Sequence, residues 1–492
     1  MKKALLYLIL FLTPLFTLAQ DALIYEDFAE KVRDISTIHY SDKLSIMMIN
    51  IDNDNFDVLA INDEMGIVWK TSLTGYAMSI SKFNGKILAI AATEHSAIKG
   101  PNNIYNGFLL NPQTGEKLIE KKLFEDSAEF QDYPQILISN ETFWGIGVRQ
   151  SNSKRKLHVG MPGLLALISI AKMQNDVIET QDLDVIQFND KLDPTNNFKP
   201  VVPPKSMFLQ MTANDKGDVF IAWLDDTWIN VHRYEYGKKD PTGIVKADIA
   251  LQQTLLKKGA NVALAPSSAN RNLVYFGLFA SDDGKNTLFV GSLDVSTGKK
   301  NMVNEVFTRD HAKELEKAFI KPNKKINDAD LGASGSLRLR YFKEVNGVLI
   351  AAMSARSYSS SNYGTYITER SVLINAYDAA LGLKFQQFLP ARYIAPKPLE
   401  YGIYARNNKL QITAVDASSG LTPNYMGLYG TLDLSTGQWD NIIRLSKKKI
   451  DGTAFPNGGE TCWFDTTFAL PYMKAKGLTG NKYDVLLQQN SY

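Results

Sequence analysis

Acidic and basic side chains that could act on a polar ligand, or bind one, occur where short apolar runs end. Four carboxylates and two arginines share this position: Glu94, Asp225, Asp226, Asp416, Arg149 and Arg356. Two carboxyl groups about 5–10 Å apart could hydrolyse a glycosidic bond. The same carboxylates, mixed with arginines, could instead form a charged rim that binds a glycan or a peptide. The chemistry therefore depends on how the fold arranges these run ends.

A second candidate is segment 357–366, which reads Ser-Tyr-Ser-Ser-Ser-Asn-Tyr-Gly-Thr-Tyr. Its aromatic members are Tyr358, Tyr363 and Tyr366. Antibody paratopes use the same residue types, because Tyr gives rigid amphipathic contact area and Ser and Asn give adaptable hydrogen bonds. Lys154 and Arg155 belong to a basic cluster that could meet phosphate or carboxylate groups. These segments favour recognition over chemistry; the alternatives are an ordinary flexible loop and a solvated charge run.

The residue patterns that many enzymes need are missing. The five histidines never fall at metal-ligand spacing, and neither a nucleophile elbow nor a phosphate-binding loop occurs. The 54 Lys and Arg residues nearly balance the 52 Asp and Glu residues, so charge gives no reason to expect a nucleic-acid partner. We therefore predict no catalytic residue, no metal and no cofactor, and we favour a protein that is not an enzyme. A carbohydrate-active enzyme built on the carboxylates above is the alternative.

Two kinds of turn recur along the chain and indicate how the candidates are positioned. The first is an apolar strand ending in Asp or Asn, with Gly four residues later. Five copies end at Gly66, Gly115, Gly298, Gly382 and Gly437. The Asp or Asn oxygen accepts bonds from nearby backbone N–H groups, and Gly is expected to take the positive φ that closes the hairpin. The long gap between the second and third copies implies two degenerate copies, near 171–177 and 236–243, which makes seven.

The second kind is a short Asn-bearing turn that alternates with the first. It occurs at Asn84, Asn140, Asn214, Asn270, Asn346, Asn407 and, near the C-terminus, Asn481. Asn-Gly between apolar runs is a strong hairpin signal. Each unit thus has four strands, as in 77–83, 86–93, 105–111 and 117–124, with short first and last turns. The longer loops, which join the second strand to the third and one unit to the next, all lie on one face of such a meander. The candidates above also lie on that face, so we expect it to bind the ligand.

Four-stranded units repeated around an axis build a β-propeller. The turns Ala60-x-Asn62, Ser292-x-Asp294-x-x-Thr297-Gly298 and Ala376-x-Asp378 resemble the repeat turn of quinoprotein-like and WD-type propellers. The resemblance covers the chain from about residue 37 but concerns the repeat alone, because quinoprotein dehydrogenases place paired cysteines near their cofactor and this chain has one cysteine. We predict an all-β fold, a seven-bladed propeller of four-stranded antiparallel blades. The spare strand 43–51 leaves eight blades as the alternative, and two packed β-sandwiches are the rival fold.

The N-terminus has the parts of a secretory signal peptide: basic Lys2 and Lys3, an apolar stretch over 4–18, and small residues up to Ala19. About 15 apolar residues is short for spanning a bilayer. We expect a signal peptide over 1–19, a lead-in over 20–36, and one propeller over 37–492 whose N- and C-terminal strands close the ring. The mature chain should have no membrane span. With Cys462 alone and no intramolecular disulfide, a bacterial periplasmic or cell-surface protein is favoured, and its partner would be an envelope protein, peptide or glycan.

Overall fold

The structure is a computed structural model. It describes residues 23–93, 104–125, 135–139, 143–151, 180–204, 206–225, 228–249, 261–282, 285–322, 324–332, 336–361, 364–395, 399–417, 424–445, 450, 454–476 and 482–492. In these ranges the regular structure is almost entirely antiparallel β-strand, and the helices are α4 (Arg309–Ala318) and the short 3-10 helix η1 (Gly458–Glu460). No helix of the described ranges is long and apolar enough to cross a membrane.

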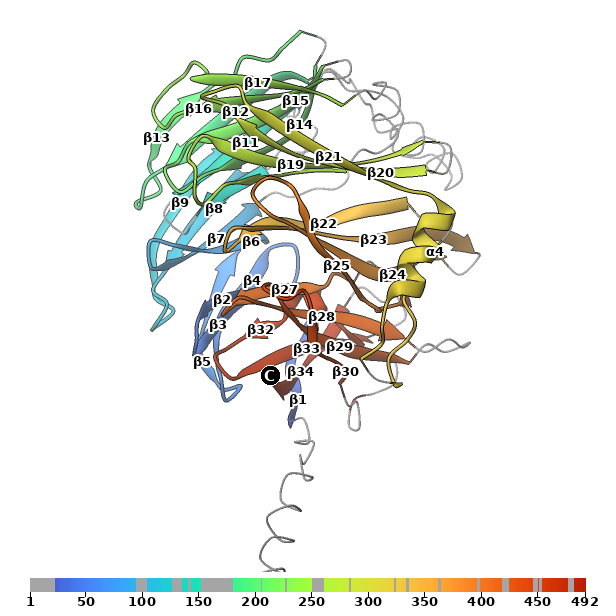
Figure 1. Cartoon of the computed structure of the whole chain (residues 1–492). Coiled ribbons are helices and arrows are strands. Elements are labelled where there is room, and N and C mark those ends of the chain that lie inside the picture. Colours follow the sequence, from blue (N-terminus) through green and yellow to red (C-terminus); the bar gives the residue numbers. More distant parts are fainter. Residues whose placement is uncertain are drawn as a thin grey trace, which may run out of the picture.

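The strands form eight sheets that follow the chain order, and we number them as blades 1 to 8 (Figure 1). Blades 1 and 2 contain β2 (Asp34–Ser41), β3 (Leu44–Asn50), β4 (Asn55–Asn62), β5 (Ile67–Thr74), β6 (Tyr76–Phe83), β7 (Lys86–Thr93), β8 (Ile104–Leu110) and β9 (Lys117–Glu125). Blades 3 and 4 contain β10 (Gln135–Ser139), β11 (Phe143–Ser151), β12 (Thr180–Phe188), β13 (Pro194–Phe198), β14 (Met207–Ala213), β15 (Val219–Asp225), β16 (Trp228–Tyr234) and β17 (Gly243–Asp248).

Blades 5 and 6 contain β18 (Asn261–Pro266), β19 (Leu273–Asp282), β20 (Lys285–Asp294), β21 (Lys300–Phe307), β22 (Ser336–Val345), β23 (Val348–Ser361), β24 (Gly364–Tyr377), β25 (Leu383–Leu389) and the added β26 (Tyr393–Ala395). Blades 7 and 8 contain β27 (Gly402–Arg406), β28 (Lys409–Ala417), β29 (Tyr425–Asp433), β30 (Trp439–Arg444), β31 (Phe455–Pro456), β32 (Cys462–Trp463), β33 (Thr467–Lys476), β34 (Lys482–Ser491) and β1 (Leu23–Val32).

The two middle strands of a blade are buried on both faces, whereas the outermost strand is half exposed. In blade 2, six consecutive residues of β7, from Ile87 to Ala92, are buried, while β9 buries only Leu123. Neighbouring blades cover both faces of the middle strands, so these strands are continuous apolar runs instead of alternating ones. The predicted strands of this blade are confirmed to within one residue at each end.

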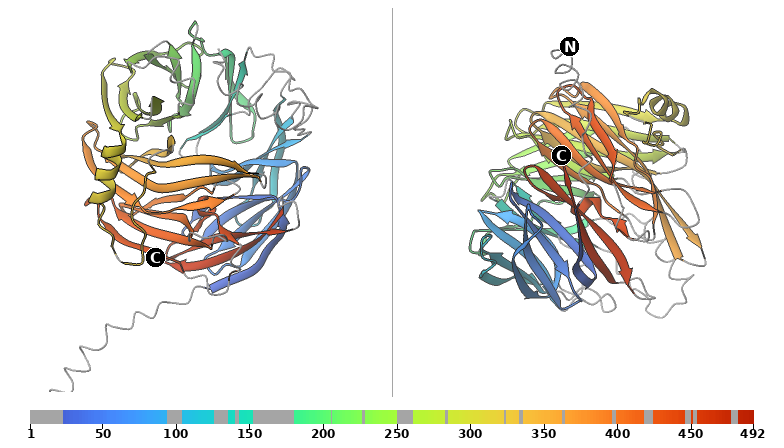
Figure 2. Two further views of the ribbon diagram at one scale, coloured as in Figure 1. Left: turned by 90° about the vertical axis from the view of Figure 1, so that its right-hand side faces the viewer. Right: turned by 90° about the horizontal axis from the view of Figure 1, so that it is seen from below.

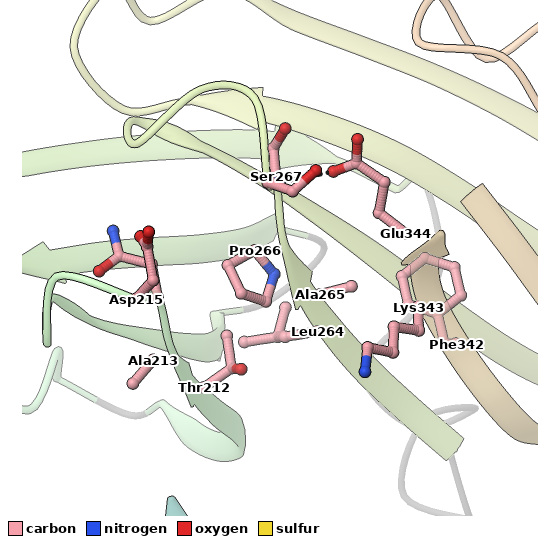
Figure 3. A pocket seen from close by; sticks show the side chains of 12 residues that line it. Thr212, Ala213, Asp215, Leu264, Ala265, Pro266, Ser267, Phe342, Lys343 and Glu344 are labelled. Carbon is pink, nitrogen blue, oxygen red and sulfur yellow. Dashed lines mark hydrogen bonds between the residues drawn. The ribbon is translucent and has the colours of Figure 1, made fainter. Parts of the chain in front are cut away.

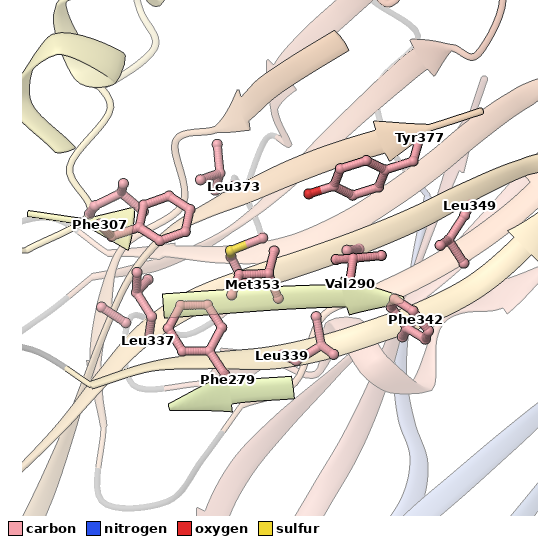
Figure 4. Packing of buried hydrophobic residues seen from close by; sticks show 14 of the residues in the cluster. Phe279, Val290, Phe307, Leu337, Leu339, Phe342, Leu349, Met353, Leu373 and Tyr377 are labelled. Atoms are coloured by element: carbon pink, nitrogen blue, oxygen red, sulfur yellow. The ribbon is translucent and has the colours of Figure 1, made fainter. Parts of the chain in front are cut away.

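Hydrophobic side chains fill the space between each blade and the next. Between blades 5 and 6, Phe279 and Val290 meet Leu339 and Met353 (Figure 4). Comparable clusters join each of the remaining pairs of consecutive blades from blade 1 to blade 8. A further cluster joins blade 8 to blade 1 and contains Leu487 and Ile49. The blades therefore form a closed ring, which is the arrangement that the repeats predict (Figure 2).

The ring has eight sheets, so the preferred count of seven blades is not confirmed and the alternative of eight matches the sheet count. Seven third-to-fourth strand turns do exist, but blade 8 has none, because its fourth strand is β1 from the N-terminus. One of the seven is Asn189–Asp193, between β12 and β13; the copy proposed near 171–177 lies outside the described residues. Asn481 also lies outside them, and its segment links the second and third strands of blade 8.

The N- and C-terminal strands meet in blade 8. There β1 pairs with β34 along an antiparallel register that runs from Leu23 opposite Gln489 to Val32 opposite Tyr483. This strand, together with the start of β2, lies within the segment 20–36 that the sequence suggested was a lead-in. The leader 1–19 lies outside the described residues.

The recurring Asp/Asn turns have two geometries. At Gly298 the backbone N–H closes the turn onto the Asp294 carbonyl at 2.9 Å, and Gly298 has a φ of 72°. At the Asn62 turn, Met65 closes the turn one residue earlier and takes the positive φ of 64°. The prediction that Gly supplies the positive φ is therefore correct for Gly115, Gly298 and Gly437, each of which follows a Thr. It is wrong for Gly66 and Gly382, because the positive φ belongs to whichever residue closes the turn.

Candidate functional site

Four of the predicted charged residues lie in the described part of the chain, and each belongs to the second strand of its blade, toward the same end of that strand. Arg149 is in β11, Asp225 ends β15, Arg356 is in β23 and Asp416 is in β28. Four of the other predicted residues lie outside the described ranges, as does one of the three tyrosines: Glu94, Lys154, Arg155, Asp226 and Tyr363. For Arg149 only the backbone is described. We call the face at this end of the second strands, opposite the tight turns, the long-loop face.

Arg356 is buried and belongs to an ion-pair cluster. Its Nε atom donates a 2.6 Å hydrogen bond to Glu369, and an Nη atom donates a 2.9 Å bond to Glu400, which precedes blade 7. Glu369 also accepts hydrogen bonds from Ser354 and from the Tyr393 hydroxyl. Burial opposes the charge on Arg356, but the two carboxylates outweigh it and raise its pKa further. The cluster links blade 6 to the segment that precedes blade 7, so Arg356 has a structural contact instead of the place in a ligand-binding rim that we predicted.

Asp416 and Asp225 are engaged in comparable contacts. Asp416 is almost completely buried. Its carboxylate accepts a 2.6 Å hydrogen bond from Arg444 and a 2.9 Å hydrogen bond from Asn327. Burial raises the pKa of Asp416, and Arg444 opposes that effect. Asp225 is half-buried, with Lys246 at 3.9 Å. Each carboxylate thus lies beside a cation of its own blade, and neither contact pairs it with a second carboxylate as the hydrolase alternative requires.

The tyrosines lie on a projecting β-ribbon. β23 and β24 have 14 residues each, and beyond Arg356 they pair with each other up to Ser361 opposite Gly364. We call residues 357–361 and 364–368 the ribbon. Tyr358 is 59% exposed and Tyr366 is 36% exposed. The segment that we expected to be a loop is therefore a hairpin, since Tyr, Thr and Ile favour strands. In Figure 1 both strands reach the side on which α4 also lies.

Ile394 extends the exposed apolar surface beside the ribbon. The short strand β26 pairs with β24 so that Ile394 lies opposite Thr368, and Ile394 is 50% exposed. The Tyr425 hydroxyl of blade 7 donates a 2.6 Å hydrogen bond to the Ile394 carbonyl and so holds β26 in place. The register places Tyr366 and Ile394 on one face of the ribbon and Tyr358 on the other. Exposed aromatic side chains on a fixed backbone are suited to binding, because few side chains must be ordered when a partner arrives.

The opposite face contains a polar pocket that the sequence reasoning missed (Figure 3). It has a volume of about 260 Å³ and lies where the first strands of blades 4, 5 and 6 end. Thr212, Asp215, Ser267, Lys343 and Glu344 contribute polar groups to its lining. The Glu344 carboxylate accepts a 2.8 Å hydrogen bond from the Ser268 N–H. The sequence did contain a signal for this pocket, because its lining residues directly precede, or lie in, the successive Asn-bearing turns.

Among the described residues, no group of three or more His, Cys, Asp or Glu side chains could hold a metal ion. Cys462 is buried, and burial raises the pKa of its thiol far above the usual range, so the thiol stays protonated.

Comparisons with known proteins agree with the architecture but add no function. No family model and no curated protein matches the chain. Among solved structures, it is similar to prolyl oligopeptidase B from Galerina marginata bound to a 35mer hydrolysis and macrocyclization substrate, at 10% identity and a TM-score of 0.44 over 91% of this chain and 56% of that one. It spans only a little over half of that enzyme.

Two further solved structures are matched over nearly their whole length. One is the WD40 domain of SCAP from fission yeast, at 11% identity and a TM-score of 0.39, over 95% of this chain and 98% of that one. The other is Chaetomium thermophilum Sqt1 bound to the N-terminus of ribosomal protein L10, at 10% identity and a TM-score of 0.42, over 96% and 100%. At such low similarity the assignment rests on the sheets themselves. Eight antiparallel sheets in a closed ring define the chain as a β-propeller repeat protein.

Proposed function

We propose that this chain is a non-catalytic binding protein that recognises a protein or peptide of the cell envelope through its long-loop face. The observation that carries the proposal is the ribbon, which projects Tyr358 and Tyr366 into solvent beyond the blade. Tyrosines of this kind are enriched among binding hot spots, because one ring gives a large contact area at a low entropy cost. The envelope location rests on the signal-peptide pattern of residues 1–19.

The charged residues of the long-loop face support a binding role more than a catalytic one. Arg356, Asp225 and Asp416 each have a counter-ion within or next to their own blade. Such pairs fix the strand ends from which the loops and the ribbon start. A rigid scaffold that presents exposed aromatic side chains is the usual arrangement of a recognition surface.

The test compares two substitutions of the same kind on opposite faces. The full chain is immobilised, a captured envelope component is purified, and its affinity is measured for wild type, for Tyr358→Ala with Tyr366→Ala, and for Tyr236→Ala. Tyr236 is a suitable control because it is 47% exposed and follows β16 on the tight-turn face. We expect the double variant to lose at least about 2 kcal/mol per hot spot, with an unchanged melting temperature, and the control to bind normally. Equal affinity of all three proteins would contradict the proposal.

A further inference from the structure

In the described part of the chain, the ribbon has an edge with which no strand pairs; residues 333–335, which directly precede β22, lie outside that part. β22 pairs with β23 only as far as Ser336 opposite Arg356, whereas β23 continues for five more residues. Among the described residues, no strand pairs with the side of β23 that faces away from β24 over residues 357–361. On the other side of the ribbon, β26 covers β24 at Ile367–Glu369. The unpaired edge therefore lies on β23 alone in that part of the ribbon.

The register decides which backbone groups face outward. Hydrogen-bonded and non-hydrogen-bonded pairs alternate along an antiparallel ladder. Ser361 lies opposite Gly364, and two residues separate them in the sequence. In such a hairpin the pair that flanks the turn is hydrogen-bonded, so Ser361, Ser359 and Ser357 bond to β24. The N–H and C=O groups of Tyr358 and Ser360 consequently point away from β24, toward the open edge.

The ribbon lacks the features that normally protect an open edge. Proteins block such edges with charged residues, proline, bulges or very short strands. Residues 357–361 and 364–368 include no charged residue and no proline, and the bulge between β23 and β24 lies before Arg356. The exposed Tyr358 side chain belongs to this edge strand. An extended peptide would satisfy the outward groups and could pack an apolar side chain against the Tyr358 ring.

We propose that β23 binds its partner by strand addition, in which an uncharged, extended peptide segment pairs with the edge formed by residues 357–361. This inference rests on the proposed function and specifies the chemistry of the partner. Main-chain hydrogen bonds to Tyr358 and Ser360 provide the pairing, and the Tyr358 ring selects an apolar residue of the peptide. Alternate peptide side chains would face the ribbon surface, which gives the bound peptide a two-residue periodicity.

The test removes one outward N–H group and leaves the side-chain patch intact. A display library of random twelve-residue peptides is selected on the full wild-type chain, and the selected peptides are measured on Ser360→Pro and Ser360→Ala. Proline removes the outward N–H group without removing a hydrogen bond within the ribbon, whereas alanine keeps that N–H group. We expect Ser360→Pro to weaken binding at least about tenfold and Ser360→Ala to leave it unchanged. An alanine scan of the peptide should show alternating sensitive positions.

Several results would overturn strand addition. They are the absence of any selected peptide, equal binding by both Ser360 variants, or a scan without periodicity. A concentration-dependent dimer that Ser360→Pro abolishes would instead assign the edge to a second copy of the chain. If the envelope partner binds Ser360→Pro normally but is lost on the Tyr358→Ala and Tyr366→Ala variant, the proposed function stands and strand addition is wrong. Circular dichroism and the melting temperature confirm that Ser360→Pro is folded.

Discussion

Arg356 and Glu369 lie opposite each other on β23 and β24 and form an ion pair of 2.6 Å, with side chains 5% and 4% exposed. In the described part of the chain, Arg356 is the last residue of β23 that pairs with β22, so the ion pair lies at the base of the ribbon. Arg340 contributes a second cation at 3.3 Å from Glu369. The cluster thus anchors the base of the segment that we propose for binding.

Arg356→Ala should destabilise the protein by about 3–5 kcal/mol, because it leaves a buried carboxylate with a more distant counter-ion. The matched control is Arg370→Ala, since Arg370 pairs with Asp330 at a half-exposed site one residue beyond Glu369. The control should cost about 0–1 kcal/mol. Urea denaturation of both variants provides the measurement, and equal losses would show that the buried cluster has no special role.

Gly298→Val should destabilise the protein by about 1–2 kcal/mol, because β-branched residues tolerate the left-handed region poorly. Gly298 has a φ of 72°, and a Cβ built there would meet nothing within 4 Å. The cost is therefore one of backbone conformation and not of steric overlap. Gly298→Asn should cost less, since Asn is the non-glycine residue best suited to this region. An unchanged melting temperature for the Val variant would be inconsistent with this geometry.

Stability should fall with pH below about 4 through Asp218. Burial alone would raise the pKa of this carboxyl, but hydrogen bonds from Arg271 and Arg233 outweigh burial and lower it from 3.8 to about 2. The folded state thus binds the proton less tightly than the unfolded chain. About 2 kcal/mol of stability is present above pH 3.8 and is lost as the pH falls toward 2.

Asp218→Asn should reduce this acid-dependent slope by the share of one carboxylate, although it also lowers stability at neutral pH by leaving two arginines without their shared carboxylate. The exposed neighbour Asp215 is the control, and Asp215→Asn should keep the slope. The free energy of unfolding, measured from pH 5 to pH 2, distinguishes the two. A slope in Asp218→Asn as steep as that of the wild type would refute the assignment.

His232 should affect stability over a higher pH range. Burial, and to a lesser extent Lys246, lowers the pKa of His232 from 6.5 to about 4. The imidazole is 5% exposed, and its Nδ1 atom has no hydrogen-bond partner in the described part of the chain. Protonation therefore favours the unfolded state, and stability present above pH 6.5 should be lost as the pH falls toward 4. His232→Phe should flatten this part of the profile, and an identical profile for wild type and variant would contradict the prediction.

The strands of blade 2 show how much of the fold could be predicted from local sequence. Apolar runs such as Ile87–Ala92, bounded by Asn-Gly and Asn-x-x-x-Gly turns, define strand limits through backbone chemistry that acts within a few residues. The blade count needed a contact across the whole chain. β1 pairs with β34, more than 450 residues away, and no turn residue marks that pairing. Counting turns therefore found seven repeats where the structure has eight sheets.

The candidate site shows the same division. The sequence by itself determined that segment 357–366 is rich in Tyr and Ser and that Arg149, Asp225, Arg356 and Asp416 belong to second strands, because these properties depend on residue type and on repeat topology. Only the tertiary structure decided that Tyr358 is exposed while Arg356 is buried, since burial depends on the neighbouring blade: Glu400, which precedes blade 7, reaches Arg356 across the interface. It also decided that, among the described residues, β23 extends beyond the strand β22 that pairs with it, because strand length within a sheet depends on the partner that it pairs with.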